Sequence, residues 1–142
     1  MEKTEYISKS PFETWEIAEA LAKKLSLGDL LLLTGELGSG KTQFVKGLAK
    51  GLGIREWMYV VSPSFTLVNV YEGGNFPLFH VDLYRISEKE VDELFIEEML
   101  EEGIVVVEWA EKINWPSFKM RISFEVVGET ERKITVENYG TI

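Results

Sequence analysis

Residues 35–42 read Gly-Glu-Leu-Gly-Ser-Gly-Lys-Thr, a combination of residue types that suits the binding of a phosphate chain. Glycines let the backbone turn so that successive N–H groups face one anion, and a following helix N-terminus adds partial positive charge. Lys41 would reach the β- and γ-phosphates, and the Thr42 hydroxyl would join the shell of a magnesium ion. The sequence therefore predicts a P-loop that binds a nucleotide through Glu36, Leu37, Gly38, Ser39, Gly40, Lys41 and Thr42.

The segments on either side of this loop have the pattern that a P-loop needs. The apolar run Leu30 to Thr34 is typical of a central strand that is buried on both faces of a parallel sheet. The segment Phe44 to Leu52 has a helical pattern, and Gly51 and Gly53 can end it. A strand, a glycine-rich turn and a helix in this order favour phosphate binding over a plain turn.

Two further apolar runs end in a carboxylate. Asp82 follows the run 78–81, and Glu108 follows the run 104–107. Ligands of open α/β sheets lie beyond the carboxyl ends of the strands, so both acids are expected to face the phosphates. Magnesium prefers oxygen ligands, so either acid could serve the metal while the other orients water. The strand pattern leaves these two roles open, and a solvated strand end remains the alternative for each acid.

The rest of the chain alternates between amphipathic helices and short strands. Ser10 and Glu13 form a capping box, which predicts a helix from Pro11 to about Ser26. Ser87 and Glu90 form a second one, which predicts a helix to about Glu102. Two antiparallel hairpins are expected, formed by residues 66–71 with 76–82 and by residues 120–127 with 132–138. We therefore predict a three-layer α/β fold of the P-loop NTPase type, whose central sheet is mixed but mainly parallel.

Composition limits the classes of function. The 142 residues suit one domain, spanning 1–142, with a single core. Fifteen basic and 24 acidic residues give a net charge of −9, the wrong sign for direct nucleic-acid binding. The chain has no cysteine, and no apolar run approaches membrane-spanning length. The expectation is a cytoplasmic protein that does not contact a membrane and meets any nucleic acid through partners.

Four blocks of sequence occur in a fixed order. They are residues 35–42, residues 62–68 (Ser-Pro-Ser-Phe-Thr-Leu-Val), residues 80–85 (His-Val-Asp-Leu-Tyr-Arg) and the pair Glu108-Trp109. Together they resemble the bacterial TsaE family, formerly called YjeE. The P-loop is shared by many superfamilies, whereas the third and fourth blocks are far more specific. Ser64 departs from the family, which usually has threonine there; the hydroxyl is kept but the β-branch is lost.

The resemblance implies a small P-loop ATPase that is required for threonylcarbamoyladenosine, formed at the tRNA adenosine beside the anticodon. It implies the transferase proteins TsaD and TsaB as partners, and contact with tRNA only through their complex. ATP hydrolysis would reset this complex between turnovers rather than transfer the threonylcarbamoyl group. We expect hydrolysis to be slow in isolation and stimulated by the partners.

The resemblance also implies residue roles. Lys41 becomes the phosphate lysine, Thr42 and Glu108 become the magnesium residues, and Asp82 lies in a switch-like motif needed for hydrolysis. The predicted catalytic set is therefore Lys41, Asp82 and Glu108, and the predicted cofactors are ATP and Mg²⁺. We expect Mg-ATP to order the segments 62–66 and 80–85, which would create the state that binds the partners.

Four other residues carry weaker predictions. Adenine contacts are expected near Pro11 and Arg132, because proline offers an apolar face and arginine a planar stacking surface. His80, the only histidine, is interpreted as a buried and hydrogen-bonded residue rather than a proton relay. Arg85 could offset transition-state charge, or it could form a salt bridge.

Two other classes of function stay open. A self-contained small-molecule kinase would need an acceptor site and usually several arginines around the transferred group, but the chain has only Arg55, Arg85, Arg121 and Arg132. A nucleotide-gated binding module would use ATP to set its conformation with little hydrolysis. A GTPase is disfavoured because the chain lacks an Asn-Lys-x-Asp guanine motif.

Overall fold

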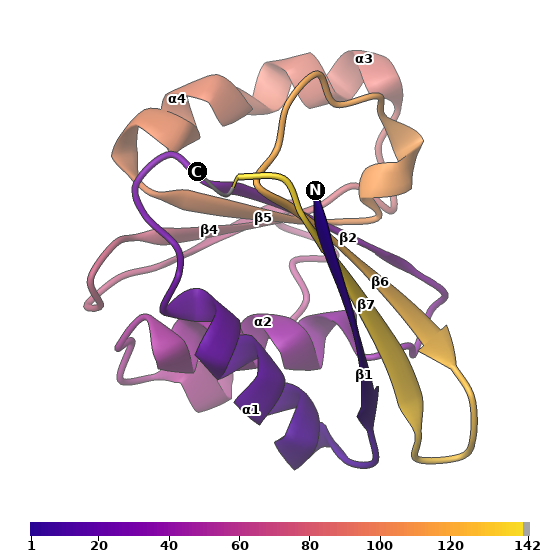
Figure 1. Cartoon of the computed structure of the whole chain (residues 1–142). Helices are drawn as coiled ribbons and strands as arrows, with labels where there is room; N and C mark the ends of the chain where they lie inside the picture. Colours follow the sequence, from indigo (N-terminus) through magenta and orange to yellow (C-terminus); the bar gives the residue numbers. More distant parts are fainter. Residues whose placement is uncertain (141–142) are drawn as a thin grey trace.

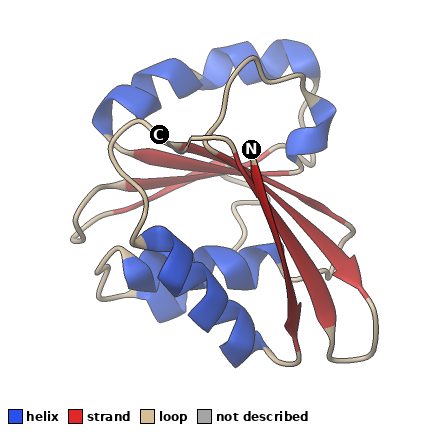
Figure 2. Cartoon of the chain, in the orientation of Figure 1, coloured by secondary structure: helices blue, strands red, loops and turns tan. Residues whose placement is uncertain are grey.

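The computed structural model describes residues 1–140, which form one seven-stranded sheet with helices on both faces (Figures 1 and 2). The strands are β1 (Glu2–Ser8), β2 (Leu30–Gly35), β3 (Val68–Tyr71), β4 (Leu78–Asp82), β5 (Ile104–Glu108), β6 (Met120–Val126) and β7 (Arg132–Asn138). The helices are α1 (Pro11–Ala22), α2 (Lys41–Gly51), α3 (Glu88–Val91) and α4 (Ile96–Glu102), with 3-10 turns at Trp57–Tyr59 (η1), Asp92–Leu94 (η2) and Ala110–Lys112 (η3). Among these described residues, no helix is long and apolar enough to cross a membrane.

The sheet is parallel at its centre and antiparallel at both edges. Its strand order is β1-β7-β6-β2-β5-β4-β3. Strands β6, β2, β5 and β4 run parallel, whereas β3 pairs with β4, and β1 and β6 pair with β7, in antiparallel directions. The register places Asp82 beside Glu108 at the carboxyl ends of β4 and β5. This confirms the predicted α/β fold class and both predicted hairpins.

Two hydrophobic layers hold the sheet between its helices. Along β2, Leu31 and Leu33 pack toward α1 and α2, whereas Leu30 and Leu32 pack toward the α3–α4 side. Alternating side chains of one strand thus enter opposite layers, which explains why the whole run is apolar. The central strand is fixed from both faces, and its carboxyl end is a rigid base for the loop that follows.

The prediction of a single helix from Ser87 to about Glu102 is wrong, because the structure has two separate helices there, α3 and α4. The capping box of Ser87 and Glu90 is present, but the chain turns at Phe95, which has a left-handed φ of 57° before α4 begins. Leu94 and Ile96 both pack into the layer on this face of the sheet. In a continuous helix they would point roughly 200° apart. The break lets both side chains reach the core. No glycine or proline in the sequence indicates where it lies.

The N-terminal region also differs from the expectation. Helix α1 ends at Ala22 rather than Ser26, because the Asp29 carboxylate accepts a hydrogen bond from the Ser26 backbone N–H, 2.8 Å away, in the following turn. Strand β1 had no counterpart in the sequence prediction. It pairs along its whole length with β7, yet its side chains are mostly exposed. An edge strand of this kind lacks an apolar signal.

Helices α1 and α2 approach closely at two glycines of α2. A Cβ added at Gly47 would lie 2.5 Å from the Trp15 carbonyl oxygen and 2.6 Å from the Ala18 Cβ. One added at Gly51 would lie 2.6 Å from the Ala22 Cβ. The close contact at Gly47 is therefore with the neighbouring helix and not with the sheet.

Gly47→Ala is expected to destabilise the protein by about 1–3 kcal/mol, because the added methyl group meets backbone that cannot move aside. This loss should outweigh the gain of about 1 kcal/mol in helix propensity. Urea unfolding monitored by circular dichroism measures the difference. Gly128→Ala is the matched control, since its nearest neighbour is 3.4 Å away. Equal stability of both variants would contradict the packing argument.

Candidate functional site

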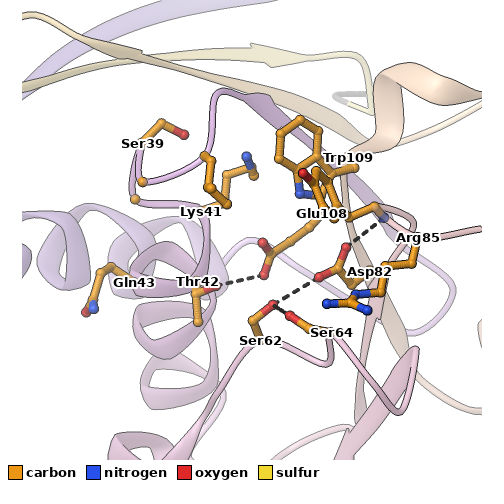
Figure 3. A pocket seen from close by; sticks show the side chains of 14 residues that line it. Ser39, Lys41, Thr42, Gln43, Ser62, Ser64, Asp82, Arg85, Glu108 and Trp109 are labelled. Carbon is orange, nitrogen blue, oxygen red and sulfur yellow. Dashed lines mark hydrogen bonds between the residues drawn. The ribbon is translucent and has the colours of Figure 1, made fainter.

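The carboxyl ends of β2, β4 and β5 meet at one edge of the sheet, where α2 begins, and a cavity of about 480 Å³ opens there (Figure 3). The P-loop lies on one side of the cavity, and segments that follow β4 and β5 lie on the other. The cavity is lined by Leu37, Gly38, Ser39, Gly40, Lys41, Thr42, Gln43, Ser62, Ser64, Asp82, Tyr84, Arg85, Glu108 and Trp109. Of the predicted nucleotide contacts on the P-loop, all except Glu36 therefore line a single cavity, together with both predicted acids.

The backbone of the loop needs glycine at particular positions. Gly38 and Gly40 have left-handed φ values of 78° and 105°. A Cβ at either position would meet no atom within 4 Å, so the requirement comes from the backbone and not from a lack of space. Left-handed residues here turn the loop so that its N–H groups can face one point. This conformation is compatible with the predicted phosphate contacts, which stay predictions.

Lys41 points its ammonium group into the loop. Its Nζ donates to the carbonyl oxygens of Gly35 (2.5 Å) and Glu36 (3.1 Å), and lies 3.9 Å from the centre of the Trp109 ring. The residue is 5% exposed, and burial lowers the pKa of the ammonium below its ordinary value, although the charge of Glu108 opposes this. A desolvated ammonium with neutral partners is well suited to bind an anion.

The Ser39 hydroxyl is an unsatisfied polar group of the same loop. Ser39 is 1% exposed, and its Oγ has no hydrogen-bond partner within residues 1–140. The first N–H groups of α2 also lack partners inside the helix, as at every helix N-terminus. A phosphate oxygen would satisfy these backbone N–H groups. The donor set of the loop thus fits a phosphate chain.

Thr42 and Glu108 lie together at the floor of the cavity. The Thr42 Oγ1 donates to the Glu108 Oε2 over 3.1 Å, and Glu108 is 3% exposed at the end of β5. The described part of the chain contains no group of three or more His, Cys, Asp or Glu side chains arranged to hold a metal. One hydroxyl and one carboxylate nevertheless fit Mg²⁺, which usually takes its other ligands from phosphate and water.

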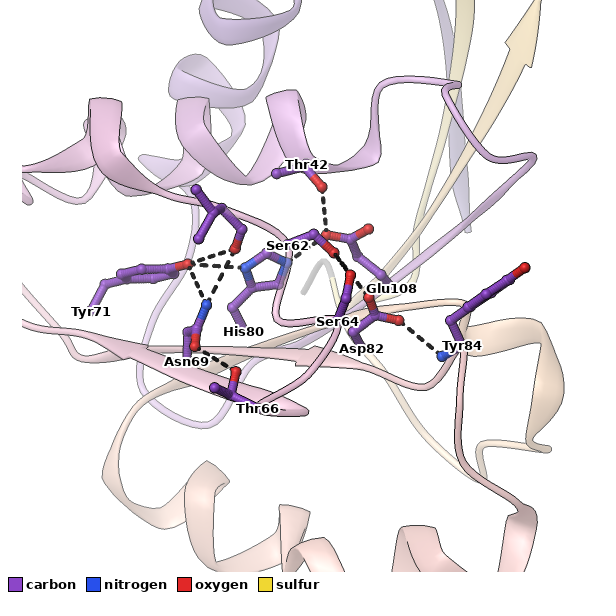
Figure 4. Close-up of polar contacts among 11 residues, drawn as sticks. Thr42, Ser62, Ser64, Thr66, Asn69, Tyr71, His80, Asp82, Tyr84 and Glu108 are labelled. Atoms are coloured by element: carbon purple, nitrogen blue, oxygen red, sulfur yellow. Dashed lines mark hydrogen bonds and ion pairs between the residues drawn. The ribbon is translucent and has the colours of Figure 1, made fainter.

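Asp82 has a different environment from Glu108, although the two are neighbours in the sheet register. Its Oδ2 accepts from the Ser62 Oγ (3.0 Å) and its Oδ1 from the Tyr84 backbone N–H (2.9 Å) (Figure 4). The Ser62 hydroxyl is also 3.1 Å from that of Ser64. Asp82 therefore connects the loop before β3 to the turn after β4, whereas Glu108 faces the P-loop threonine.

His80 and Tyr71 form the polar layer behind Glu108. His80 is fully buried, with its Nε2 2.5 Å from the Glu108 Oε2 and its Nδ1 3.3 Å from the Tyr71 hydroxyl. The interpretation of His80 as a buried, hydrogen-bonded residue is confirmed. Tyr71 was missed, because a single tyrosine in a short strand carries no sign of what it contacts.

The remaining predicted residues lie outside the hydrogen-bonded centre. Arg85 lines the cavity with its guanidinium 4.6 Å from the centre of the Phe65 ring, and within residues 1–140 it forms no salt bridge. Arg132 donates to the Gly38 carbonyl over 3.1 Å and pairs with Ser8 across β7 and β1. Pro11 begins α1. Neither Pro11 nor Arg132 lines the cavity, and their adenine contacts stay predictions.

The mixed sheet, and the glycine-rich turn between β2 and α2, define a P-loop α/β protein. The family model for the threonylcarbamoyl adenosine biosynthesis protein TsaE matches residues 8–134. The chain therefore belongs to the TsaE family, whose members take part in the biosynthesis of tRNA threonylcarbamoyladenosine.

Individual relatives agree with this assignment. The chain is 39% identical to a tRNA threonylcarbamoyladenosine biosynthesis protein TsaE from Bacillus subtilis, over 99% of this chain and 89% of the relative. It is also 39% identical to one from Aquifex aeolicus, over 93% of this chain and 94% of the relative. The crystal structure of Bacillus subtilis YdiB superposes with a TM-score of 0.79 at 34% identity, covering 98% of this chain and 87% of that one.

Proposed function

We propose that this protein is an Mg-dependent ATPase that supports threonylcarbamoyladenosine formation by binding the TsaD and TsaB transferase proteins and resetting them between turnovers. The observation that carries the proposal is the buried Lys41 ammonium in a glycine-turned loop at the start of α2. A phosphate would pair with this ammonium, and the neighbouring Thr42–Glu108 pair offers oxygen ligands to its metal.

Each residue has a role that follows from its contacts. Lys41 binds the β- and γ-phosphate oxygens, and Thr42 and Glu108 hold the magnesium ion. Bound magnesium supplies neutralisation of the charge that develops on the transferred phosphoryl group. Asp82 orients the attacking water, and Arg85 is the cationic group available to offset charge at the open side of the cavity. Hydrolysis then removes the γ-phosphate contact that holds the loops.

The contacts of Asp82 support slow hydrolysis in isolation. Both of its oxygens are occupied, by Ser62 and by the Tyr84 N–H, and Arg85 lies over the Phe65 ring. Each oxygen keeps a second acceptor site, but a carboxylate whose direction is fixed by both contacts must turn before it can orient a water elsewhere in the cavity. A partner that moves the loop containing Ser62 would release it, which agrees with stimulation by the transferase proteins.

Exposed apolar side chains surround the cavity and support a protein partner. Leu37 is 78% exposed and Phe65 is 84% exposed, and Tyr84 is also exposed. Exposed apolar side chains that cluster around the opening of a cavity are typical of protein interaction sites. The net charge of −9 disfavours direct tRNA binding, so contact with tRNA would pass through the complex.

A multiple-turnover tRNA modification assay, reconstituted with TsaD and TsaB, tests the proposal. We expect product to exceed one equivalent per transferase complex only when this chain is present, because each cycle needs a reset. Lys41→Ala should limit the reaction to about one turnover. Unchanged turnover without the chain, and with Lys41→Ala, would contradict the proposal and favour an independent kinase. If the chain fully stimulates turnover of the transferase complex while its ATP is bound but not hydrolysed, the nucleotide-gated binding module is favoured.

A further inference from the structure

The buried His80 imidazole occupies a position between the proposed metal ligand and a loop that borders the cavity (Figure 4). On one side its Nε2 meets the Glu108 Oε2 at 2.5 Å. On the other side its Nδ1 meets the Tyr71 hydroxyl at 3.3 Å. His80 is fully buried and does not line the cavity, so it cannot itself touch a bound nucleotide. Any effect that it has on the site must act through Glu108.

The hydrogen bonds of Glu108 are unequally divided between its two oxygens. Oε2 receives both the Thr42 Oγ1 (3.1 Å) and the His80 Nε2 (2.5 Å). Within residues 1–140 no hydrogen bond uses Oε1. Because two partners fix one oxygen, the rotation of the carboxylate is fixed, and the other oxygen is available to a metal.

The Tyr71 hydroxyl carries this arrangement to the loop before β3. It donates to the Val61 carbonyl oxygen over 3.1 Å, and the Asn69 Nδ2 donates to the same carbonyl over 3.3 Å. The next residue is Ser62, whose hydroxyl donates to Asp82. Hydrogen bonds through His80 and Tyr71, together with the peptide unit between Val61 and Ser62, therefore join Glu108 to Asp82.

We propose that His80 is a positioning residue that orients the Glu108 carboxylate for magnesium, and that Tyr71 fixes His80 and thereby links the metal site to the loop at Ser62. The inference rests on the proposed function, since it concerns the metal of the same site. It goes beyond that function by assigning a role to two residues that touch neither nucleotide nor metal.

The test measures ATP binding by the full-length chain while MgCl₂ is titrated. In His80→Leu we expect the Mg²⁺ concentration at half-maximal effect to rise about 10- to 100-fold, the usual cost of losing a partner of a metal ligand. His80→Gln, which can keep a donor near Nε2, should recover most of this loss. Tyr71→Phe removes only a hydroxyl and should raise the midpoint about 2- to 10-fold. ATP affinity in EDTA should change less than about twofold in all three.

Tyr6→Phe in β1, at a residue that does not line the cavity, is the matched control. Wild-type Mg²⁺ midpoints in both His80→Gln and His80→Leu would overturn the inference, as would an equal loss of ATP affinity in EDTA. If His80→Leu does not fold, the other two variants decide. Wild-type Mg²⁺ midpoints in both Tyr71→Phe and His80→Gln would then overturn the inference. If the wild-type chain shows no Mg-dependent ATP binding, the proposed function fails first, which separates the two failures.

A second readout needs no nucleotide. Phe65 is 84% exposed and Tyr59 is 78% exposed, so chymotrypsin can reach both ends of the loop. Tyr71→Phe should speed cleavage there in the metal-free protein, because the Val61 carbonyl loses one of its two donors. Tyr6→Phe should not. Equal cleavage rates in Tyr71→Phe and the wild type would contradict the link to the loop.

Discussion

Lys41→Met is expected to weaken Mg-ATP binding by about 100-fold, or ~2.7 kcal/mol, because the variant loses the charged hydrogen bonds to the phosphates. The fold should survive. The Lys41 side chain is buried, and burial already lowers the pKa of its ammonium, so an apolar chain of similar length removes a desolvation cost. Equilibrium titration with a fluorescent ATP analogue measures the affinity.

Thermal unfolding of the same sample separates binding from folding. Lys41→Met should melt at or above the temperature of the wild-type protein. Lys24→Ala, an exposed change outside the site, is the control and should keep wild-type affinity. Wild-type affinity in Lys41→Met would contradict the assignment of Lys41, whereas a large fall in melting temperature would show that the residue is structural.

Asp82→Ala and Glu108→Ala should differ in their effect on Mg-ATP binding. Loss of a water-orienting group typically costs a factor of about 10² to 10⁴ in rate, so Asp82→Ala should nearly abolish partner-stimulated hydrolysis while Mg-ATP binding persists. Glu108→Ala removes the oxygen that faces Thr42 and should weaken binding only when magnesium is present.

Parallel measurements of phosphate release and of ATP affinity, with and without Mg²⁺, separate the two roles. Glu93→Ala is a suitable control, because Glu93 is an exposed acid that neither lines the cavity nor acts on the charge of Lys41. If Asp82→Ala loses the Mg-dependent part of binding and Glu108→Ala keeps it, the two roles are reversed. The strand pattern alone left this choice open, and the Thr42–Glu108 contact now supports one answer.

The parts of the fold that follow local rules could be predicted from the sequence. Strand β2 is a continuous apolar run, the P-loop before α2 is rich in glycine, and α1 begins after the capping residue Ser10. The break at Phe95 could not be predicted, because it arises where Leu94 and Ile96 must reach the same layer. Strand β1 could not be found either, since its stability comes from pairing with β7 and not from an apolar face.

The site shows the same division. The P-loop residues and both acids occur in short motifs, so their residue types indicate their chemistry. The polar layer behind Glu108 depends on the exact register of β3 and β4, which places Asn69 opposite His80. Tyr71 lies two residues farther along the same face and reaches the imidazole diagonally. The hairpin was predicted, but its register was not, and the network follows from the register.

Isothermal titration calorimetry of the folded wild-type chain with Mg-ATP tests the central claim most directly. A glycine-turned loop with a buried ammonium at a helix N-terminus should bind the triphosphate at one site, giving a saturable heat with a stoichiometry of one. Absence of any heat with ATP, whether the chain is alone or mixed with TsaD and TsaB, would contradict the account.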